Sequence, residues 1–274
     1  MAVHFVNITP QEFQEVALFK LIKENYIGST LGSAKPYLYF ANPASWSDAF
    51  EKRFINVLYK EGNNPLVDYP LKNKVFCSCF SHTRIVEAQW FVYSRTKKDE
   101  LKGLIQLTFN NQQLLDELNR FNAENDADIY IGKVAYQETR KIKGRISKNN
   151  FLNVPKQFSL NCEESLIRLL LLKRNAFIAE NEIRIIIVKK EPDLQSGIKL
   201  YYKCQPTDLI SRITINDWFT TKGLKAQLES PIGQSINGLP CYGFTPVIDI
   251  KGKNHPRVVE SHIYSHQHPK FVVV

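Results

Sequence analysis

The strongest strand signal in the chain is the run Glu182-Ile183-Arg184-Ile185-Ile186-Ile187-Val188. β-Branched residues dominate the run, and such residues favour a pleated, buried strand. Because side chains alternate across a strand, Glu182 and Arg184 share one face, and their apolar neighbours point to the other. Glu180, two residues earlier, extends the polar face. We therefore predict a strand with two acids and one base on one side.

Outward from this run, strands and helices are predicted along most of the chain. Further strands are expected at residues 37–40, 74–80, 104–109, 129–136, 200–203, 209–215 and 247–250. Helices are expected at residues 45–58, 85–93, 114–121, 161–172 and 220–228, with Ser45 and Asn161 as the caps of the first and fourth. The fold class is therefore α+β: a single domain over residues 1–250, whose mixed or antiparallel central sheet is flanked by helices. Residues 251–274 are predicted to form a C-terminal tail or extension.

The first helix has the clearest start signal. Thr9-Pro10-Gln11-Glu12 fits a capping box, in which Thr9 caps the helix and Glu12 returns a bond to the cap. Apolar residues then follow at helical spacing: Phe13, Val16, Ala17, Leu18 and Leu21. This pattern predicts one helix that ends near Gly28.

The composition excludes several classes of protein. The chain has 274 residues, 43% of them hydrophobic, which is enough to bury a full core. We expect no membrane span, since no apolar run approaches about 20 residues, and no signal peptide at residues 1–10. The five cysteines are odd in number and scattered, which favours reduced thiols and a cytoplasmic location. The net charge of +9 favours a polyanionic partner, either nucleic acid, a nucleotide or an acidic protein.

Several well-specified motifs are missing from the sequence. It has no phosphate-binding P-loop, no Gly-x-Gly-x-x-Gly, no His-Glu-x-x-His and no Gly-x-Ser-x-Gly. His262, His266 and His268 have partial metal-ligand spacing, but Pro269 follows and no acid cluster accompanies them, so we predict a polar tail and no metal. The basic stretch 140–148 lacks the aromatic residues of nucleic-acid grooves, which favours a solvated loop.

What remains is an ordered series of short pieces. They are Leu38-Tyr39-Phe40-Ala41-Asn42-Pro43-Ala44-Ser45-Trp46-Ser47-Asp48-Ala49-Phe50-Glu51, Val75-Phe76-Cys77-Ser78-Cys79-Phe80-Ser81, Gln89-Trp90-Phe91-Val92-Tyr93 with Lys102-Gly103-Leu104, Val134-Ala135-Tyr136, and residues 172–184. Over residues 20–215 this series resembles the bacterial family "domain of unknown function 2971". Two positions depart from the family pattern: Ala49 stands where the family prefers Pro, and no His precedes Gly103.

The layout also resembles, more faintly, ADP-ribosyltransferases of the toxin type that modify nucleic acid. That resemblance implies NAD as the substrate and Glu182 as the catalytic acid or base, because a carboxylate stabilises the oxocarbenium-like state of glycosidic cleavage. It implies that Arg184 and Lys173 act on the pyrophosphate. The implied cofactor-binding set is Tyr39, Asp48, Glu51, Trp90, Tyr93 and Lys173. A toxin or phage-defence effector of this kind would have an antitoxin partner.

All of these residues except Tyr39 also have a structural interpretation. Glu182 and Arg184 fit the solvated face of an edge strand, where ion pairs contribute little. Asp48 and Glu51 fit the first turn of a helix. Trp90 and Tyr93 fit core packing, and Lys173 fits a helix C-cap.

Two other functions stay open at this point. One is a non-catalytic module that binds a nucleotide, nucleic acid or protein, and the other is a metal-free nuclease that uses the carboxylates.

Overall fold

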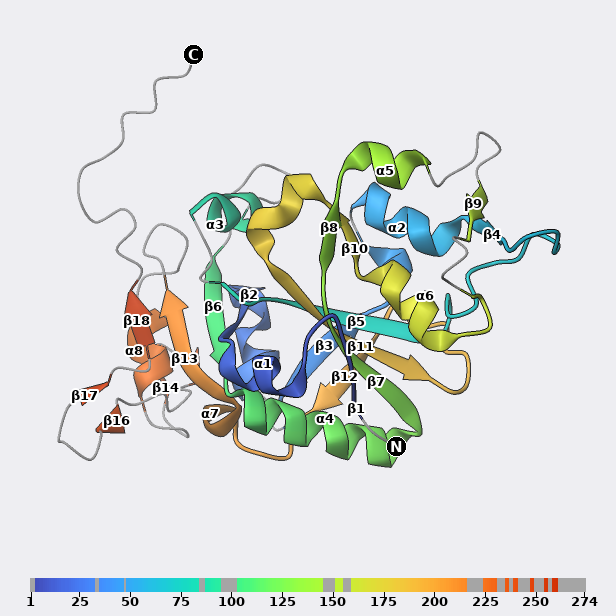
Figure 1. Ribbon diagram of the computed structural model, residues 1–274. Helices are drawn as coiled ribbons and strands as arrows, with labels where there is room; N and C mark the ends of the chain where they lie inside the picture. Colours follow the sequence, from blue (N-terminus) through green and yellow to red (C-terminus); the bar gives the residue numbers. More distant parts are fainter. Residues whose placement is uncertain are drawn as a thin grey trace, which may run out of the picture. The chain divides into compact units, whose positions relative to one another are not determined.

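The architecture was analysed in a computed structural model of the chain (Figure 1). The structure describes residues 3–32, 35–46, 48–83, 87–94, 103–144, 151–154, 159–215 and 224–230. It also describes the short strands at 235–236, 239–240, 247–248, 254–255 and 258–260. The C-terminal histidines and residues 145–148 of the basic stretch lie outside these residues. Residues 140–144 of that stretch belong to a helix, so the prediction of a loop is wrong there.

The chain has an α+β fold with a mixed sheet and flanking helices, as the sequence predicts. Its contacts group into two compact units, and each unit is assembled from three segments of the sequence. Unit 1 comprises Met1–Val16, Leu38–Thr83 and Asn111–Tyr201. Unit 2 comprises Ala17–Tyr37, Arg84–Asn110 and Tyr202–Val274. The single domain over residues 1–250 and its boundary stay a prediction.

Unit 1 is built around strand β11 (Glu182–Lys189), which pairs antiparallel with two neighbours. These neighbours are β7 (Ala127–Lys133) and β5 (Val75–Ser81). Strand β1 (Val3–Val6) joins the far side of β7 in parallel. Strand β3 (Tyr37–Ala41) pairs with both β5 and β12 (Gly197–Tyr201). The sheet is therefore mixed, and β11 lies in its interior.

Helices cover both sides of this sheet. Helix α4 (Asn111–Asn125) packs against β7 and β1 through Leu114 and Leu118, and α1 (Pro10–Glu15) contacts α4. Helices α2 (Ala49–Asn56) and α6 (Glu163–Leu170) bury Ile55 and Ile167 in a core with Ile186 of β11. In Figure 1, α4 lies on one side of β7 and β11 and α6 on the other.

Shorter elements complete unit 1. They are the parallel pair β8 (Ala135–Gln137) and β10 (Leu172–Arg174), the parallel pair β4 (Leu58–Lys60) and β9 (Phe151–Asn153), helix α5 (Thr139–Gly144), and the 3-10 helices η3 (Pro43–Ser45) and η4 (Asn175–Glu180). Strand β10 and helix η4 connect α6 to β11, so the stretch from Leu172 to Glu180 lies beside the start of the central strand.

Unit 2 has its own run of strands. Its strand β6 (Leu104–Phe109) pairs antiparallel with β2 (Leu18–Lys23) and β13 (Ile210–Ile215), and β18 (Val258–Glu260) extends the run in parallel. The remaining elements are η1 (Glu24–Tyr26), η2 (Gly28–Gly32), α3 (Glu87–Ser94), α7 (Pro206–Leu209), α8 (Leu224–Glu229), β14 (Ser235–Ile236), β15 (Leu239–Pro240), β16 (Val247–Ile248) and β17 (Asn254–His255).

The first predicted helix is correct at its start and wrong at its end. The capping box forms: the Glu12 amide donates to Thr9 Oγ1 at 3.1 Å, and the Thr9 amide donates to Glu12 Oε2 at 2.7 Å. The helix stops at Glu15, however, and residues from Leu18 onward form β2. The apolar residues at 16–21 fit helical spacing, but pairing with β6 overrides that local preference.

Two other predicted helix boundaries are also wrong. Helix α2 begins at Ala49, with Asp48 before it, whereas Ser45 ends the short η3. Helix α6 has Cys162 rather than Asn161 at its N-cap, and Leu172 belongs to strand β10. Lys173 therefore lies on a strand and does not cap a helix.

No helix in the described part of the chain is both long and apolar enough to cross a membrane.

Gly132 on β7 gives a test of the packing between sheet and helix. It pairs with Arg184 in the ladder, and a Cβ built on it would lie 2.4 Å from Leu171 Cδ1, just after α6. We expect Gly132→Val to lower the free energy of unfolding by about 1–3 kcal/mol, because the added methyl groups overpack this contact. Urea denaturation measures the change. Lys133→Val, at the exposed next position, is the control, and equal stability of the two variants would refute the packing argument.

Candidate functional site

The polar face of β11 is buried. Glu182 is 3% exposed and Arg184 is 1% exposed, since β11 lies between two strands and beneath α2 and α6. The interpretation of these residues as the solvated face of an edge strand is therefore wrong. Charges enclosed in this way must be paired, because an isolated ion in the protein interior costs several kcal/mol.

The guanidinium of Arg184 is bonded through all three of its nitrogens. Nε donates to Glu182 Oε1 at 2.7 Å, and Nη2 donates to Glu51 Oε1 at 2.9 Å and to Glu182 Oε2 at 3.1 Å. Nη1 donates to the carbonyl oxygen of Leu170, the last residue of α6. That carbonyl belongs to a helix C-terminus, which favours a cation. Arg184 thus joins β11, α2 and α6.

Lys173 lies among three carboxylates. Its Nζ is 2.6 Å from Glu180 Oε2, 2.9 Å from Glu182 Oε2 and 3.1 Å from Glu51 Oε1. The side chain is 8% exposed. Lys173 comes from β10, whose parallel pairing with β8 aligns it with Tyr136. We call Glu51, Lys173, Glu180, Glu182 and Arg184 the charge cluster.

The charge cluster contains one more carboxylate than cation. Burial alone would raise the pKa of Glu182, but Arg184 and Lys173 outweigh burial and lower this pKa to about 2. Burial opposes the charge of Lys173, yet Glu182 and Glu51 hold its pKa above the usual range. At neutral pH Glu182 is thus a carboxylate. Ionisable groups perturbed by burial and by specific partners are typical of functional sites, and of structural ion networks too.

Aromatic side chains and a second ion pair border the charge cluster. The guanidinium carbon of Arg184 lies 4.7 Å from the ring centre of Trp46. The ring of Phe177, on η4, lies 5.0 Å from Lys173 Nζ and 4.9 Å from Arg174 Cζ. Arg174 Nη2 donates to Asp48 Oδ2 at 2.9 Å. The side chains of Arg174 and Asp48 are 28% and 23% exposed, so this pair forms the outer rim.

Local backbone structure brings these groups together. Asp48 precedes α2 and accepts from the Glu51 amide at 3.3 Å, which places Glu51 in the first turn facing β11. At the other end, Asn181 has a φ of 40°, and this left-handed residue turns the chain from η4 into β11. Asn tolerates that conformation better than most residues. Ser81 of β5 donates to the Glu180 carbonyl at 2.7 Å, which fixes the turn.

The sequence predicts most members of this cluster. For Glu180, the structure differs from the prediction in the element that carries the residue. Glu182, Arg184, Lys173 and Glu51 meet directly, and Asp48 reaches the rim through Arg174. Glu180 joins them from the end of η4, and not from the strand itself. Trp46, Arg174 and Phe177 belong to the ordered sequence pieces, but the sequence analysis assigns them no role. Their position is the available signal: Trp46 and Phe177 are aromatic residues within four positions of Asp48 and Lys173, and Arg174 is a cation next to Lys173.

The other predicted cofactor-binding residues are not members of the charge cluster. Tyr39 is on β3, 44% exposed, with its ring against Gly197 of β12. Trp90 and Tyr93 belong to α3 in unit 2. Trp90 is 1% exposed and packs with Leu104, whereas Tyr93 is 43% exposed.

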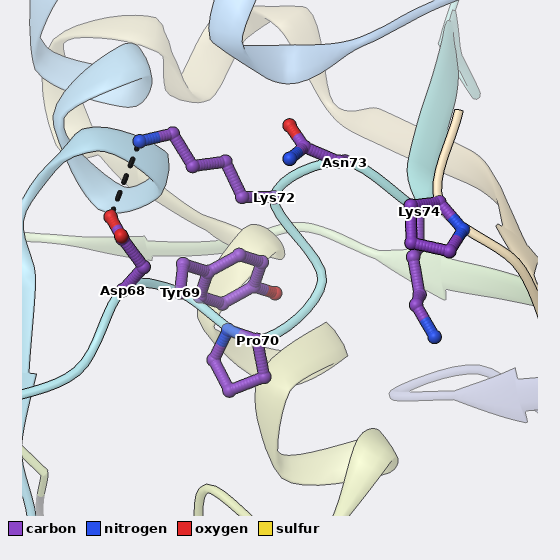
Figure 2. A pocket seen from close by; sticks show the side chains of 7 residues that line it. Asp68, Tyr69, Pro70, Lys72, Asn73 and Lys74 are labelled. Atoms are coloured by element: carbon purple, nitrogen blue, oxygen red, sulfur yellow. Dashed lines mark hydrogen bonds and ion pairs between the residues drawn. The ribbon is translucent and has the colours of Figure 1, made fainter. Parts of the chain in front are cut away.

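The structure also has a surface pocket that contains none of the predicted site residues. It has a volume of about 330 Å³ and is lined by Asp68, Tyr69, Pro70, Lys72, Asn73, Lys74 and Pro192 (Figure 2). Lys72 pairs with Asp68 at 3.3 Å, and Lys74 Nζ donates to the Lys190 carbonyl at 2.6 Å. Both cations of the pocket are thus bonded within the protein. Among the described residues, no group of His, Cys, Asp or Glu is arranged to hold a metal ion.

No family model, no curated protein and no solved structure matches the chain. The resemblances described above therefore stay predictions.

The charge cluster predicts a specific pH dependence of stability. Because the pKa of Glu182 is lowered from 4.5 to about 2, its ionisation stabilises the fold above about pH 5, and this contribution is lost as the pH falls toward 2. We expect Glu182→Gln to lower the free energy of unfolding by about 3–5 kcal/mol at pH 7, since it leaves Arg184 underpaired. The difference from the unmodified chain should shrink toward pH 3.

Urea denaturation at several pH values measures both effects. Glu124→Gln is the matched control, because Glu124 pairs with Arg120 on the surface of α4 and is 43% exposed. Its effect should stay below about 1 kcal/mol. A Glu182→Gln effect that is equally small, or independent of pH, would contradict the assignment of a buried, ionised Glu182.

Proposed function

We propose that the chain transfers ADP-ribose from NAD to an acceptor and that the charge cluster is its catalytic centre. The observation that carries the proposal is the group of three carboxylates held around Lys173 and Arg184 in a buried site bordered by aromatic rings. Glycosidic cleavage develops positive charge on the ribose, and a preorganised negative site stabilises that charge most strongly where water is excluded. The resemblance of the sequence pieces to ADP-ribosyltransferases supports the same chemistry.

The proposed reaction breaks the bond between ribose C1′ and the nicotinamide nitrogen. The bonding electrons leave with nicotinamide, which departs as a neutral molecule. Glu182, ionised at neutral pH, accepts a hydrogen bond from a ribose hydroxyl and stabilises the oxocarbenium-like carbon. The lone pair of the acceptor then forms the new bond at C1′, and the proton of the acceptor passes to Glu180. Glu180 suits this step because its side chain, 15% exposed, is the most accessible carboxylate of the cluster.

The remaining members act through Glu182 and Glu180. Arg184 holds the Glu182 carboxylate from two sides, and Lys173 bridges Glu182 to Glu180. Glu51 balances both cations. We therefore assign Arg184, Lys173 and Glu51 as positioning residues. The pyrophosphate is assigned to Arg174 at the rim, where it would exchange with Asp48.

Catalysis of this kind requires η4 to move. Glu182 is 3% exposed, and η4 carries both Phe177 and Glu180 over the cluster. The segment is short and carries the exposed Ile178. Asp48–Arg174 and Glu180–Lys173 are the ion pairs that attach it. Binding of NAD would replace these contacts, as closure and opening of active-site segments do in many enzymes.

In a cell, such an activity suits a toxin or a phage-defence effector, with an antitoxin as partner. Nucleic acid is the acceptor that the net charge of +9 favours.

A non-catalytic binding module is the second candidate, because every described charge of the cluster is paired within the protein. An ion network whose members are all paired can have a purely structural role, which here is to fix the packing of β11, α2 and α6. On this account the protein binds its partner elsewhere on its basic surface, and NAD is not consumed.

Incubation of the purified chain with NAD distinguishes the two candidates. We expect nicotinamide release, measured by mass spectrometry, in the presence of DNA, RNA or cell lysate. Glu182→Gln should lower the rate by at least about 100-fold and Glu180→Gln by about 10- to 100-fold, consistent with the loss of transition-state stabilisation and of a general base. The acceptor that gains the mass of ADP-ribose identifies the substrate.

Glu164→Gln, which removes an exposed carboxylate paired with Arg168 on the surface of α6, serves as the control and should keep the full rate. Circular dichroism establishes that each variant is folded under the assay conditions. Full activity in folded Glu182→Gln would exclude the proposed role. Absence of nicotinamide release from the folded, unmodified chain with every acceptor would favour the binding module, and shortened DNA or RNA would favour a nuclease.

A further inference from the structure

Beyond the charge cluster, the strand pair β3 and β12 presents two exposed aromatic rings on one face of the sheet. Tyr39 of β3 and Tyr201 of β12 are each 44% exposed. The pair is joined where the Asn42 amide donates to the Ser196 carbonyl at 2.8 Å. Since side chains alternate, Gly197, Lys199 and Tyr201 share a face of β12. We call Tyr39, Gly197, Lys199 and Tyr201 the tyrosine platform.

Gly197 allows the ring of Tyr39 to lie across the neighbouring strand. A Cβ at this position would lie 2.2 Å from Tyr39 Oη and 2.3 Å from its Cζ. Any larger residue would push the ring away. The hydroxyl end of the Tyr39 ring therefore lies close to the backbone of β12 at Gly197, and 44% of the residue is exposed to solvent. An accessible aromatic ring of this kind is suited to stacking on a planar group.

The charge of the platform indicates which class of planar ligand it binds. Lys199 is exposed and lies between Gly197 and Tyr201 on the same face, and neither β3 nor β12 contains an acidic residue. The Asn42 amide donates to the Ser196 carbonyl and the Tyr202 amide donates to the Pro36 carbonyl, which aligns Tyr39 with Lys199. The cation therefore lies beside Tyr39 and two residues from Tyr201 on the same face. Alternation of stacking rings with a cation is how sequence-tolerant sites hold a single strand of nucleic acid, because bases stack on the rings and phosphates meet the cation.

Further contacts fix the platform at its two ends. Arg120 of α4 donates to the Tyr201 carbonyl at 2.5 Å, and Glu117 and Glu124 orient the guanidinium. The opposite end is fixed by Asn42, whose side chain also donates to the Lys72 carbonyl at 3.0 Å. The two tyrosines are thus carried by an anchored strand pair, which reduces the entropy lost on binding.

We infer that the tyrosine platform binds single-stranded nucleic acid, with bases stacked on Tyr39 and Tyr201 and a phosphate at Lys199. The net charge of +9 supports a polyanionic ligand. This inference does not depend on the transfer of ADP-ribose, because binding is measured without NAD. Tyr39 thereby acquires a role separate from the cofactor contact that the sequence resemblance implied.

Fluorescence anisotropy with labelled 20-nucleotide oligo(dT) and oligo(U) tests the inference. Tyr39→Ala and Tyr201→Ala should each weaken binding about 10-fold through the loss of one stacked base. Tyr39→Phe, which keeps the ring, should bind like the unmodified chain. Lys199→Ala should reduce the slope of log K against log salt by about one unit. A duplex of the same length should bind more weakly than the single strand.

Tyr26→Ala is the matched control, since Tyr26 is 54% exposed and lies outside the platform. Unfolding curves establish that each variant is folded, and Tyr39→Phe and Lys199→Ala keep the test informative if an alanine variant is unstable. Binding that is absent at low salt, unchanged in both folded alanine variants, or equally strong for the duplex would overturn the inference. Loss of nicotinamide release in Glu182→Gln with intact oligonucleotide binding would separate the two functions.

Discussion

The structure of unit 1 depends on a buried guanidinium. Arg184 lies in the middle of a sheet and beneath two helices, where its charge is tolerated only because two carboxylates and a helix-terminal carbonyl oxygen bond to it. These partners come from different parts of the chain. The need to satisfy one cation therefore fixes how β11, α2 and α6 meet, and Lys173 and its carboxylates complete the arrangement.

The sequence predicts the central strand and much of the candidate site because their signals are local. The β-branched run around Ile185 strongly favours a buried strand, and the alternation of side chains places Glu182 and Arg184 on the same face. The helix signal at Thr9 is also local, and the capping box forms as predicted. These features need no knowledge of distant partners.

Two of the wrong predictions share one cause, which is pairing between distant segments. Residues from Leu18 to Leu21 fit a helix, but they form a strand because β6 lies more than 80 residues away in the sequence and pairs with them. The interpretation of Lys173 as a helix cap is wrong for the same reason, because Lys173 pairs with Tyr136, which is distant in the sequence. Burial of Glu182 could not be predicted either, since α2 and α6 cover it only after the chain has folded.

The two proposed functional regions differ in how they would act. The charge cluster is closed and preorganised, so it would catalyse a reaction only after a ligand displaces η4. The tyrosine platform is open and carries its rings on an anchored strand pair, so it would bind first. By register, Ala41 of β3 pairs with Cys77, and Arg184 pairs with Cys79 on the same strand. Tyr39 and Arg184 therefore lie on one face of the unit 1 sheet.

The most direct test of the account is a crystal structure of the chain with a non-cleavable carbocyclic analogue of NAD. The account predicts that the cyclopentane ring, which stands in for the nicotinamide ribose, lies within hydrogen-bond distance of the Glu182 carboxylate. It also predicts that η4 is displaced and that Arg184 is unchanged. An analogue bound away from the charge cluster, or a cluster that stays closed at saturating analogue, would contradict the claim that these buried carboxylates form a catalytic centre.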